Sequence, residues 1–220
     1  MSETHTTVHE ATYRALREII LFGGLLPGKA VTLRGLAEQL DVSPTPVREA
    51  VRRLIAERAL HFKDNRRVSI PQMSEQRFKE IRLARMLIEP ELAALAMPKI
   101  DKLCIAQLQQ IDQRTDTALE NGDIEGYMRS NYEFHFQIYR RTNSDVLLGL
   151  ADSLWLQFGP FMRLVYGRMG TSSMEDQHRV AIVALQQNDA ISFKNAIAQD
   201  IQQGMNFIEF NGAEKSELLS

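Results

Sequence analysis

Cysteine is nearly absent from this chain of 220 residues, which contains Cys104 alone. A single cysteine excludes a disulfide within the chain and is typical of a protein kept in a reducing compartment. No apolar run approaches the length that spans a membrane. The first ten residues, MSETHTTVHE, are too polar for a signal peptide. These absences predict a cytoplasmic protein.

The chain also lacks a large excess of charge of either sign, because it contains 26 Lys and Arg residues and 28 Asp and Glu residues. Their distribution is uneven: residues 1–74 hold 11 basic and 8 acidic side chains, and the remainder holds 15 and 20. A basic N-terminal part followed by an acidic remainder fits a protein that binds nucleic acid through its N-terminal part only. No glycine-rich phosphate loop or nucleophile motif is present, so we expect neither an enzyme nor an organic cofactor.

The segment 32–54, TLRGLAEQLDVSPTPVREAVRRL, predicts two short helices joined by a tight turn at Asp41 and Val42. Thr32 and Ser43 are expected to cap them, and Pro44 fits the first helical position because that position needs no N–H. Apolar residues recur at helical spacing in both helices. They are Leu33, Leu36, Ala37 and Leu40 in the first helix, and Val47, Ala50, Val51 and Leu54 in the second.

The second helix leaves a polar outer face at its start. Ser43, Pro44, Thr45 and Arg48 lie on this face, and Arg52 and Arg53 lie further along. Recognition helices present their first residues to base edges, and hydroxyls with an arginine suit phosphate and guanine contacts. An ordinary solvated basic face is the alternative. The capped turn and the bare helix start together favour a DNA-binding helix-turn-helix.

The flanking segments complete a winged helix. Residues 8–22 predict an amphipathic helix whose apolar face holds Val8, Ala11, Ala15, Leu16 and Ile19. Two short strands are predicted at 60–62 and 68–70, and the polar tip between them includes Arg66 and Arg67 near the phosphate backbone. We expect a DNA-binding domain over 1–74, in which Pro71–Ser74 is the linker.

Residues 75–220 predict an all-α bundle. Its helices are expected at 75–97, 101–121, 123–141, 144–168, 172–188 and 189–210. Pro90 is expected to kink or split the first of them.

Four segments resemble known proteins. LAEQLDVSPTPVREAVRRL, preceded by LLPGKAVT, resembles the DNA-binding domain of GntR-type bacterial transcription regulators. EIRLARMLIEPELAALA, NYEFHFQIYRRTNS and EDQHRVAIVALQQNDAISFKNAI are similar to the FCD ligand-binding domain of the FadR-like subgroup. The resemblance covers about residues 8–210 and implies a winged helix-turn-helix followed by an FCD-type helical bundle.

The resemblance also implies which residues contact DNA. By position these are Arg34, Ser43, Pro44, Thr45 and Arg48. Many family members have an arginine where Pro44 stands, so one base-reading contact is expected to be missing. The family's wing carries a glycine near its tip, whereas this wing has none and is more basic.

A divalent metal site and an effector pocket are implied within the bundle. The family's metal ligands correspond here to Asn131, His135, His178 and Asp200, an altered set of two imidazoles, one carboxylate and one amide. Such donors suit Zn, Ni or Mn. The alternative is a polar pocket in which both histidines only form hydrogen bonds. Arg82, Arg163 and Tyr166 are expected to line the effector site.

The resemblance therefore implies a homodimeric transcriptional regulator, by default a repressor, of a palindromic double-stranded operator. Its effector would be a small carboxylate. Two other functions stay open from the sequence: a metal-dependent enzyme tethered to DNA, and an effector-free DNA-binding dimer.

Overall fold

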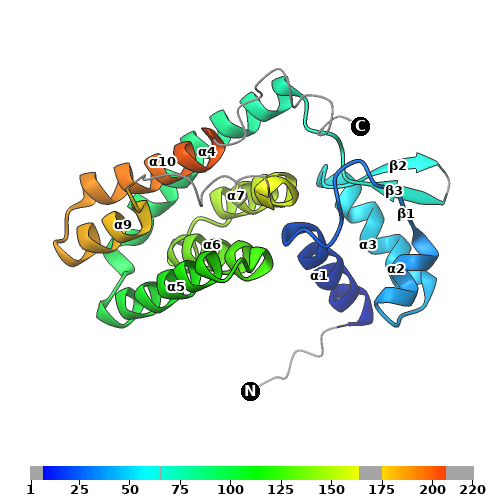
Figure 1. The fold of residues 1–220 in the computed structure, drawn as a ribbon, viewed down its shortest axis with the longest axis horizontal. Coiled ribbons are helices and arrows are strands. Elements are labelled where there is room, and N and C mark those ends of the chain that lie inside the picture. The colour runs from blue at the N-terminus through cyan, green and yellow to red at the C-terminus, as the bar shows by residue number, and fades with distance from the viewer. Residues whose placement is uncertain (1–6, 65, 164–174, 207–220) are drawn as a thin grey trace. The chain divides into compact units, whose positions relative to one another are not determined.

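The computed structural model describes residues 7–64, 66–163 and 175–206. The chain divides into two compact units, one built around the residues up to Ser74 and the other beginning at Glu75 (Figure 1). Within the described ranges, no helix is both long enough and apolar enough to cross a membrane.

The first unit is a winged helix, as predicted. Its helices are α1 (Val8–Leu21), α2 (Leu33–Gln39) and α3 (Pro44–Ala56), and its strands are β1 (Val31–Thr32), β2 (His61–Asp64) and β3 (Arg67–Ser69). The strands form an antiparallel sheet in the order β1-β3-β2. Strand β1 was not predicted, because two residues are too few to show an alternating pattern.

The helix-turn-helix follows the sequence prediction closely. Thr32 caps α2, since its Oγ1 accepts the backbone N–H of Gly35 at 2.9 Å. The turn after α2 has Asp41 at φ 52°, a left-handed conformation that Asp tolerates better than most residues. The N–H of Val42 then donates to the carbonyl of Ala37 at 3.0 Å and closes the turn.

The buried face of α1 differs from the predicted one. Val8 is 60% exposed and Ala11 is exposed, whereas Thr12 and Tyr13 are buried together with Leu16. Burial of the two hydroxyls is tolerated because both are hydrogen-bonded: Thr12 donates to the Val8 carbonyl, and Tyr13 donates to Glu57 on the segment after α3. An apolar pattern alone does not detect such satisfied polar groups.

The second unit is helical, as predicted. Its α-helices are α4 (Glu75–Ala96), α5 (Lys102–Glu120), α6 (Ile124–Tyr139), α7 (Asp145–Phe158), α9 (Gln177–Gln186) and α10 (Ala190–Asn206). Short 3-10 turns follow α4 at Met97–Lys99 and α7 at Gly159–Phe161. Aspartate side chains cap α5, α6 and α9 by accepting backbone N–H groups.

Two prolines act differently from each other in this unit. Pro90 does not split α4, which runs unbroken through it with the proline ring buried. Pro160 interrupts the helix predicted over 144–168: α7 stops at Phe158 and a 3-10 turn follows, because the proline has no N–H for the next α-helical hydrogen bond. The part of that prediction from residue 164 onward lies outside the described residues.

Five of these helices form a closed ring. Helix α10 packs against α4 and α9, α9 packs against α5, α5 against α6, and α6 against α4. Figure 1 shows α10 alongside α4 and α9, and α5 alongside α6. Side chains that point into the ring from different helices therefore meet in one buried interior.

Candidate functional site

The start of α3 exposes the residues that the sequence selected for DNA reading. Its four apolar residues Val47, Ala50, Val51 and Leu54 are at most 3% exposed and hold the helix against the unit. Ser43, Pro44, Thr45 and Arg48 lie on the exposed side, and Arg34 is exposed on α2. The surface combines hydroxyls with two guanidinium groups, which suit phosphate and guanine acceptors.

The predicted capping role of Ser43 is wrong. Ser43 occupies the N-cap position with an extended backbone, but its side chain makes no capping hydrogen bond. A cap accepts the N–H of the second or third helical residue, and the third here is Pro46, which has no N–H. The Ser43 hydroxyl stays at the exposed helix start.

Arg53 lies in a network within the first unit. Its guanidinium stacks 3.5 Å from the centre of the Tyr13 ring and pairs with Glu10 at 3.1 Å and Glu57 at 3.3 Å. Burial and the hydrogen bond to Glu57 raise the pKa of Tyr13 to about 12, so Tyr13 stays a neutral donor. Arg53 therefore fastens α3 to α1, while Arg48 and Arg52 remain exposed along α3.

The wing carries its basic residues at the tip. Arg66 and Arg67 are both exposed, and the Nε of Arg67 donates to Asp64 Oδ2 at 2.6 Å. The structure thus places both predicted wing residues on the surface. It also gives Arg67 an acidic neighbour that the sequence prediction did not include.

The ring of helices encloses a polar cluster built around two histidines. His135 of α6 lies with its Nε2 2.9 Å from Asp200 Oδ2 of α10. His178 of α9 lies with its Nε2 3.8 Å from Asp200 Oδ1. The two histidines are at most 5% exposed. One ligand atom from each of the three residues lies within 4.8 Å of the other two.

Hydrogen bonds on the far side of each imidazole fix where its lone pair points. Asp112 Oδ1 lies 3.1 Å from His178 Nδ1, and a carboxylate only accepts, so Nδ1 carries the proton. In the neutral ring Nε2 is then a lone pair, and it is buried without a hydrogen-bond partner among the described residues. Such an atom calls for a proton or a metal ion.

The same argument applies to His135. The Tyr139 hydroxyl donates a hydrogen bond to Glu89 at 2.9 Å. The Tyr139 oxygen therefore accepts the hydrogen bond from His135 Nδ1, 3.1 Å away. The neutral His135 ring therefore directs the lone pair of Nε2 at the carboxylate of Asp200. A lone pair and a carboxylate at 2.9 Å repel each other unless a proton or cation lies between them.

Both protonation and metal binding fit the electrostatics of this cluster. Burial opposes a charge on His178, but Asp200 and Asp112 outweigh burial and raise its pKa. Burial likewise opposes ionisation of Asp200, yet the two histidines lower its pKa to about 2. A carboxylate that stays ionised between two imidazole nitrogens is a donor set suited to a divalent transition metal.

A buried ion pair adjoins the histidines. Glu89 is fully buried on α4 and accepts from Arg85 at 2.5 Å, from Tyr139 at 2.9 Å and from Trp155 Nε1 at 2.9 Å. The Arg85 guanidinium also lies 4.5 Å from the centre of the Trp155 ring. Through Tyr139, this network joins α4 to His135.

Asn131 lies buried on α6, one helical turn before His135. Of the predicted effector residues, Arg82 is half-buried on α4, Arg163 is exposed, and Tyr166 lies outside the described residues. Arg85, which sequence reasoning missed, is the arginine that joins the network. Its signal was an arginine and a glutamate four residues apart within the buried stripe of α4.

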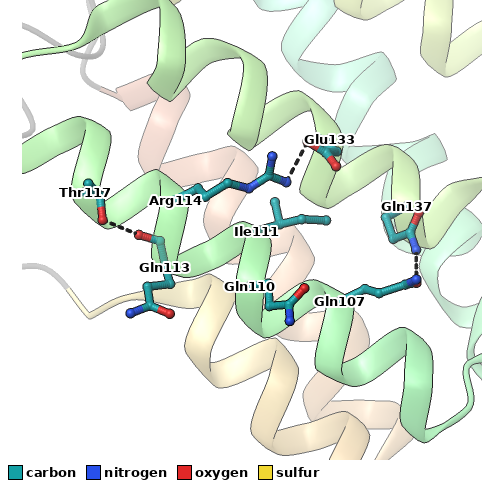
Figure 2. Close-up of a pocket in the computed structure, with 8 residues that line it drawn as sticks. All are labelled: Gln107, Gln110, Ile111, Gln113, Arg114, Thr117, Glu133 and Gln137. Carbon is teal, nitrogen blue, oxygen red and sulfur yellow. Dashed lines mark hydrogen bonds and ion pairs between the residues drawn. The ribbon is translucent and has the colours of Figure 1, made fainter.

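Side chains of α5 and α6 line a polar groove (Figure 2). It measures about 490 Å³ and is lined by Gln107, Gln110, Ile111, Gln113, Arg114, Thr117, Glu133 and Gln137. Its side chains bond to one another, as Arg114 does to Glu133 at 2.8 Å and Gln137 to Gln107 at 2.6 Å. No predicted site residue lines it.

Comparison with known families matches both units. Residues 8–70 match the family described as bacterial regulatory proteins, gntR family. Residues 80–203 match the FCD domain.

Individual relatives agree with these matches. The HTH-type transcriptional regulator McbR of Escherichia coli K12 is 28% identical over 86% of this chain and 87% of its own length. The HTH-type transcriptional repressor RspR of the same strain is 21% identical over 89% of this chain and 86% of its own. The solved structure of E. coli McbR/YncC superposes with a TM-score of 0.85 at 27% identity, covering 93% of this chain and 99% of that one. A structure from Rhodococcus sp. RHA1, 19% identical over 91% of this chain and 96% of its own, shares the fold with a TM-score of 0.71.

Proposed function

Because the chain belongs to the GntR family of bacterial regulatory proteins and carries an FCD domain, we propose that this DNA-binding regulator is a metabolite-responsive repressor of the FadR-like subgroup. Its relatives are transcriptional regulators, so the chain is a regulator rather than an enzyme. The exposed start of α3 reads the operator. The histidine cluster inside the helical unit is the observation that supports an effector site.

Arg48→Ala is expected to weaken operator binding by about 1–3 kcal/mol, because a bidentate contact to guanine is lost. Arg48 is exposed, so the thermal unfolding curve should not move. Fluorescence anisotropy at matched salt, with a duplex selected by the wild-type protein from a random-sequence library, measures the loss. Arg53→Ala is the contrasting variant, since it breaks the network with Tyr13 and should lower stability instead. Full affinity in Arg48→Ala would remove the residue from the DNA-reading set.

A homodimer follows from the way such a unit reads DNA, since one winged helix covers too few base pairs for useful specificity. Helix α4 offers a face for the second copy. Leu83, Leu87 and Leu95 are 62%, 64% and 53% exposed, and helical spacing places them with Ala84 and Ala94 on the side opposite the buried stripe. An exposed apolar helix face of this length fits an interface between copies.

Leu87→Glu is expected to raise the dimer dissociation constant by at least about tenfold, because each buried leucine contributes roughly 1.5–3 kcal/mol. Leu103→Glu is the matched control, since Leu103 is 68% exposed on α5, away from this face. Sedimentation velocity over a concentration series measures both variants. If Leu103→Glu dissociates the dimer and Leu87→Glu does not, the interface lies elsewhere.

The charges of the cluster favour a bound cation. With neutral imidazoles, the carboxylates of Glu89, Asp112 and the partly exposed Asp200 outnumber the guanidinium of Arg85, so the cluster carries an excess of negative charge. Burying unbalanced charge is costly, and one divalent ion would balance it. His135, His178 and Asp200 would hold Zn, Ni or Mn, and Asn131 would add an amide oxygen. The ion would supply a positive charge to which a carboxylate effector binds.

An acid that enters this interior without the cation would meet two uncompensated carboxylates. We therefore expect small organic acids to release the selected duplex only from protein loaded with metal. Titration of hydroxy and keto acids, with and without Zn, Ni or Mn, tests the proposal by anisotropy. Release that needs no metal would favour a hydrogen-bonding pocket. No response to any acid would favour a DNA-binding dimer without this effector class.

A further inference from the structure

The wing turns tightly without a glycine. Strand β2 ends at Asp64 and β3 begins at Arg67, and the register between the two strands shifts between Phe62 and Asp64. Tight hairpin tips usually rely on glycine, because glycine adopts left-handed backbone conformations at little cost. A side chain that accepts backbone N–H groups can stabilise a turn of this kind.

The side chain of Asp64 is such an acceptor. Its Oδ1 accepts the backbone N–H of Arg66 at 2.9 Å and that of Arg67 at 3.0 Å, an arrangement known as an Asx turn. Its Oδ2 accepts the Nε of Arg67 at 2.6 Å. These hydrogen bonds to Arg66 and Arg67 also lower the pKa of Asp64, so the carboxylate stays ionised.

The base of the wing is fixed separately. Val68 of β3 is fully buried and pairs with Val31 on one side and with Phe62 on the other. The carbonyl of Arg66 accepts the N–H of Leu33, the first residue of α2, at 3.1 Å. The backbone of Arg66 is thereby tied both to the helix-turn-helix and to Asp64.

A carboxylate at this place opposes the wing's electrostatic task. Arg66 and Arg67 are exposed cations suited to phosphate, and a neighbouring negative charge weakens attraction to DNA. Removing only the negative charge of Asp64 should therefore strengthen the binding of DNA. A loss of binding on removal of Asp64 would show that geometry outweighs charge.

We propose that Asp64 is a positioning residue of the DNA-binding wing, which holds the Arg66 backbone so that its guanidinium meets the phosphate backbone. The inference rests on the proposed contact between the wing and DNA. It assigns Arg66 as the wing residue that contributes most of the positive charge toward DNA, because the charge of Arg67 is partly neutralised by its ion pair with Asp64.

Asp64→Asn and Asp64→Ala separate geometry from charge, since both remove one negative charge. Asparagine keeps an oxygen that accepts the two backbone N–H groups, and alanine does not. We expect Asp64→Asn to bind the library-selected duplex at least as tightly as wild type. Asp64→Ala should bind at least about fivefold more weakly than Asp64→Asn, the loss that corresponds to one of the two hydrogen bonds at about 1 kcal/mol. In Asp64→Ala, the slope of log binding constant against log salt concentration should decrease in magnitude by about one, as it should in Arg66→Ala.

Amide hydrogen exchange by NMR provides a readout that does not depend on DNA. The amides of Arg66 and Arg67 should exchange about fivefold faster in Asp64→Ala than in Asp64→Asn. Equal DNA affinity of the two variants would overturn the proposal. If the exchange rates differ while Arg48→Ala and wild type bind DNA alike, the proposed DNA-reading mode fails and the turn assignment stands.

Discussion

Glu89→Ala is expected to lower the free energy of unfolding by about 3–5 kcal/mol, because it removes the carboxylate that accepts two hydrogen bonds from the buried Arg85 guanidinium. Arg85 is 3% exposed, so little solvent is available to replace the lost carboxylate. Tyr139 and Trp155 lose their acceptor in the same substitution. Urea denaturation monitored by circular dichroism measures the effect.

Two further variants separate the charge from the packing. Glu89→Gln keeps an acceptor for Tyr139 and Trp155 but removes the charge, so we expect an intermediate loss. The double variant Arg85→Met with Glu89→Leu should recover the part of the loss that comes from the buried charge, although Tyr139 and Trp155 still lack their acceptor. If Glu89→Ala lowers the free energy of unfolding by less than about 1 kcal/mol, water reaches Arg85 and the ion pair is solvent-accessible.

His178→Ala and His135→Ala are each expected to abolish binding of Zn, Ni or Mn by the helical unit, because each removes one of two imidazole donors. Asn131→Ala should only weaken binding, since an amide oxygen is the poorest donor of the set. Asn131→Asp should tighten it by adding a charge. Because neutral imidazoles are required and the pKa of His178 is raised by Asp200 and Asp112, metal occupancy should fall as the pH drops, beginning above the ordinary titration range of histidine.

Elemental analysis of protein purified without chelator or histidine tag measures the metal content. His9→Ala is the matched control, since His9 lies on α1 in an exposed ion pair with Glu49. Wild-type protein that stays empty after dialysis against Zn, Ni and Mn would identify the cluster as a hydrogen-bonding pocket.

Local patterns were sufficient to predict the helix-turn-helix and the exposed start of α3. The cap at Thr32, the turn at Asp41 and the apolar stripe from Val47 to Leu54 all depend on residues within one or two helical turns. Ser43 shows the limit of such rules, because one of the two helical residues whose N–H its side chain could accept is a proline.

Partners distant in sequence could not be predicted in the same way. Asp112 forms a hydrogen bond with His178, 66 residues further along the chain. Glu89 accepts a hydrogen bond from Trp155, which also lies 66 residues further along. The only sequence signal is a charged residue within a buried stripe, as Asp112 stands between Ile111 and Thr115 on α5. That pattern marks a buried polar group without naming its partner.

The short strands of the wing have a consequence for how two copies of the protein can lie together. Both outer strands of the sheet are poor templates for a further strand, because β1 has two residues and β2 carries the register shift and Lys63. Short, charged and irregular edges are how natural sheets avoid joining edge to edge. In the proposed dimer, where two wings would lie on one operator, such edges would protect the wings against pairing into a continuous sheet, and therefore against aggregation at the high local concentration that the DNA would impose.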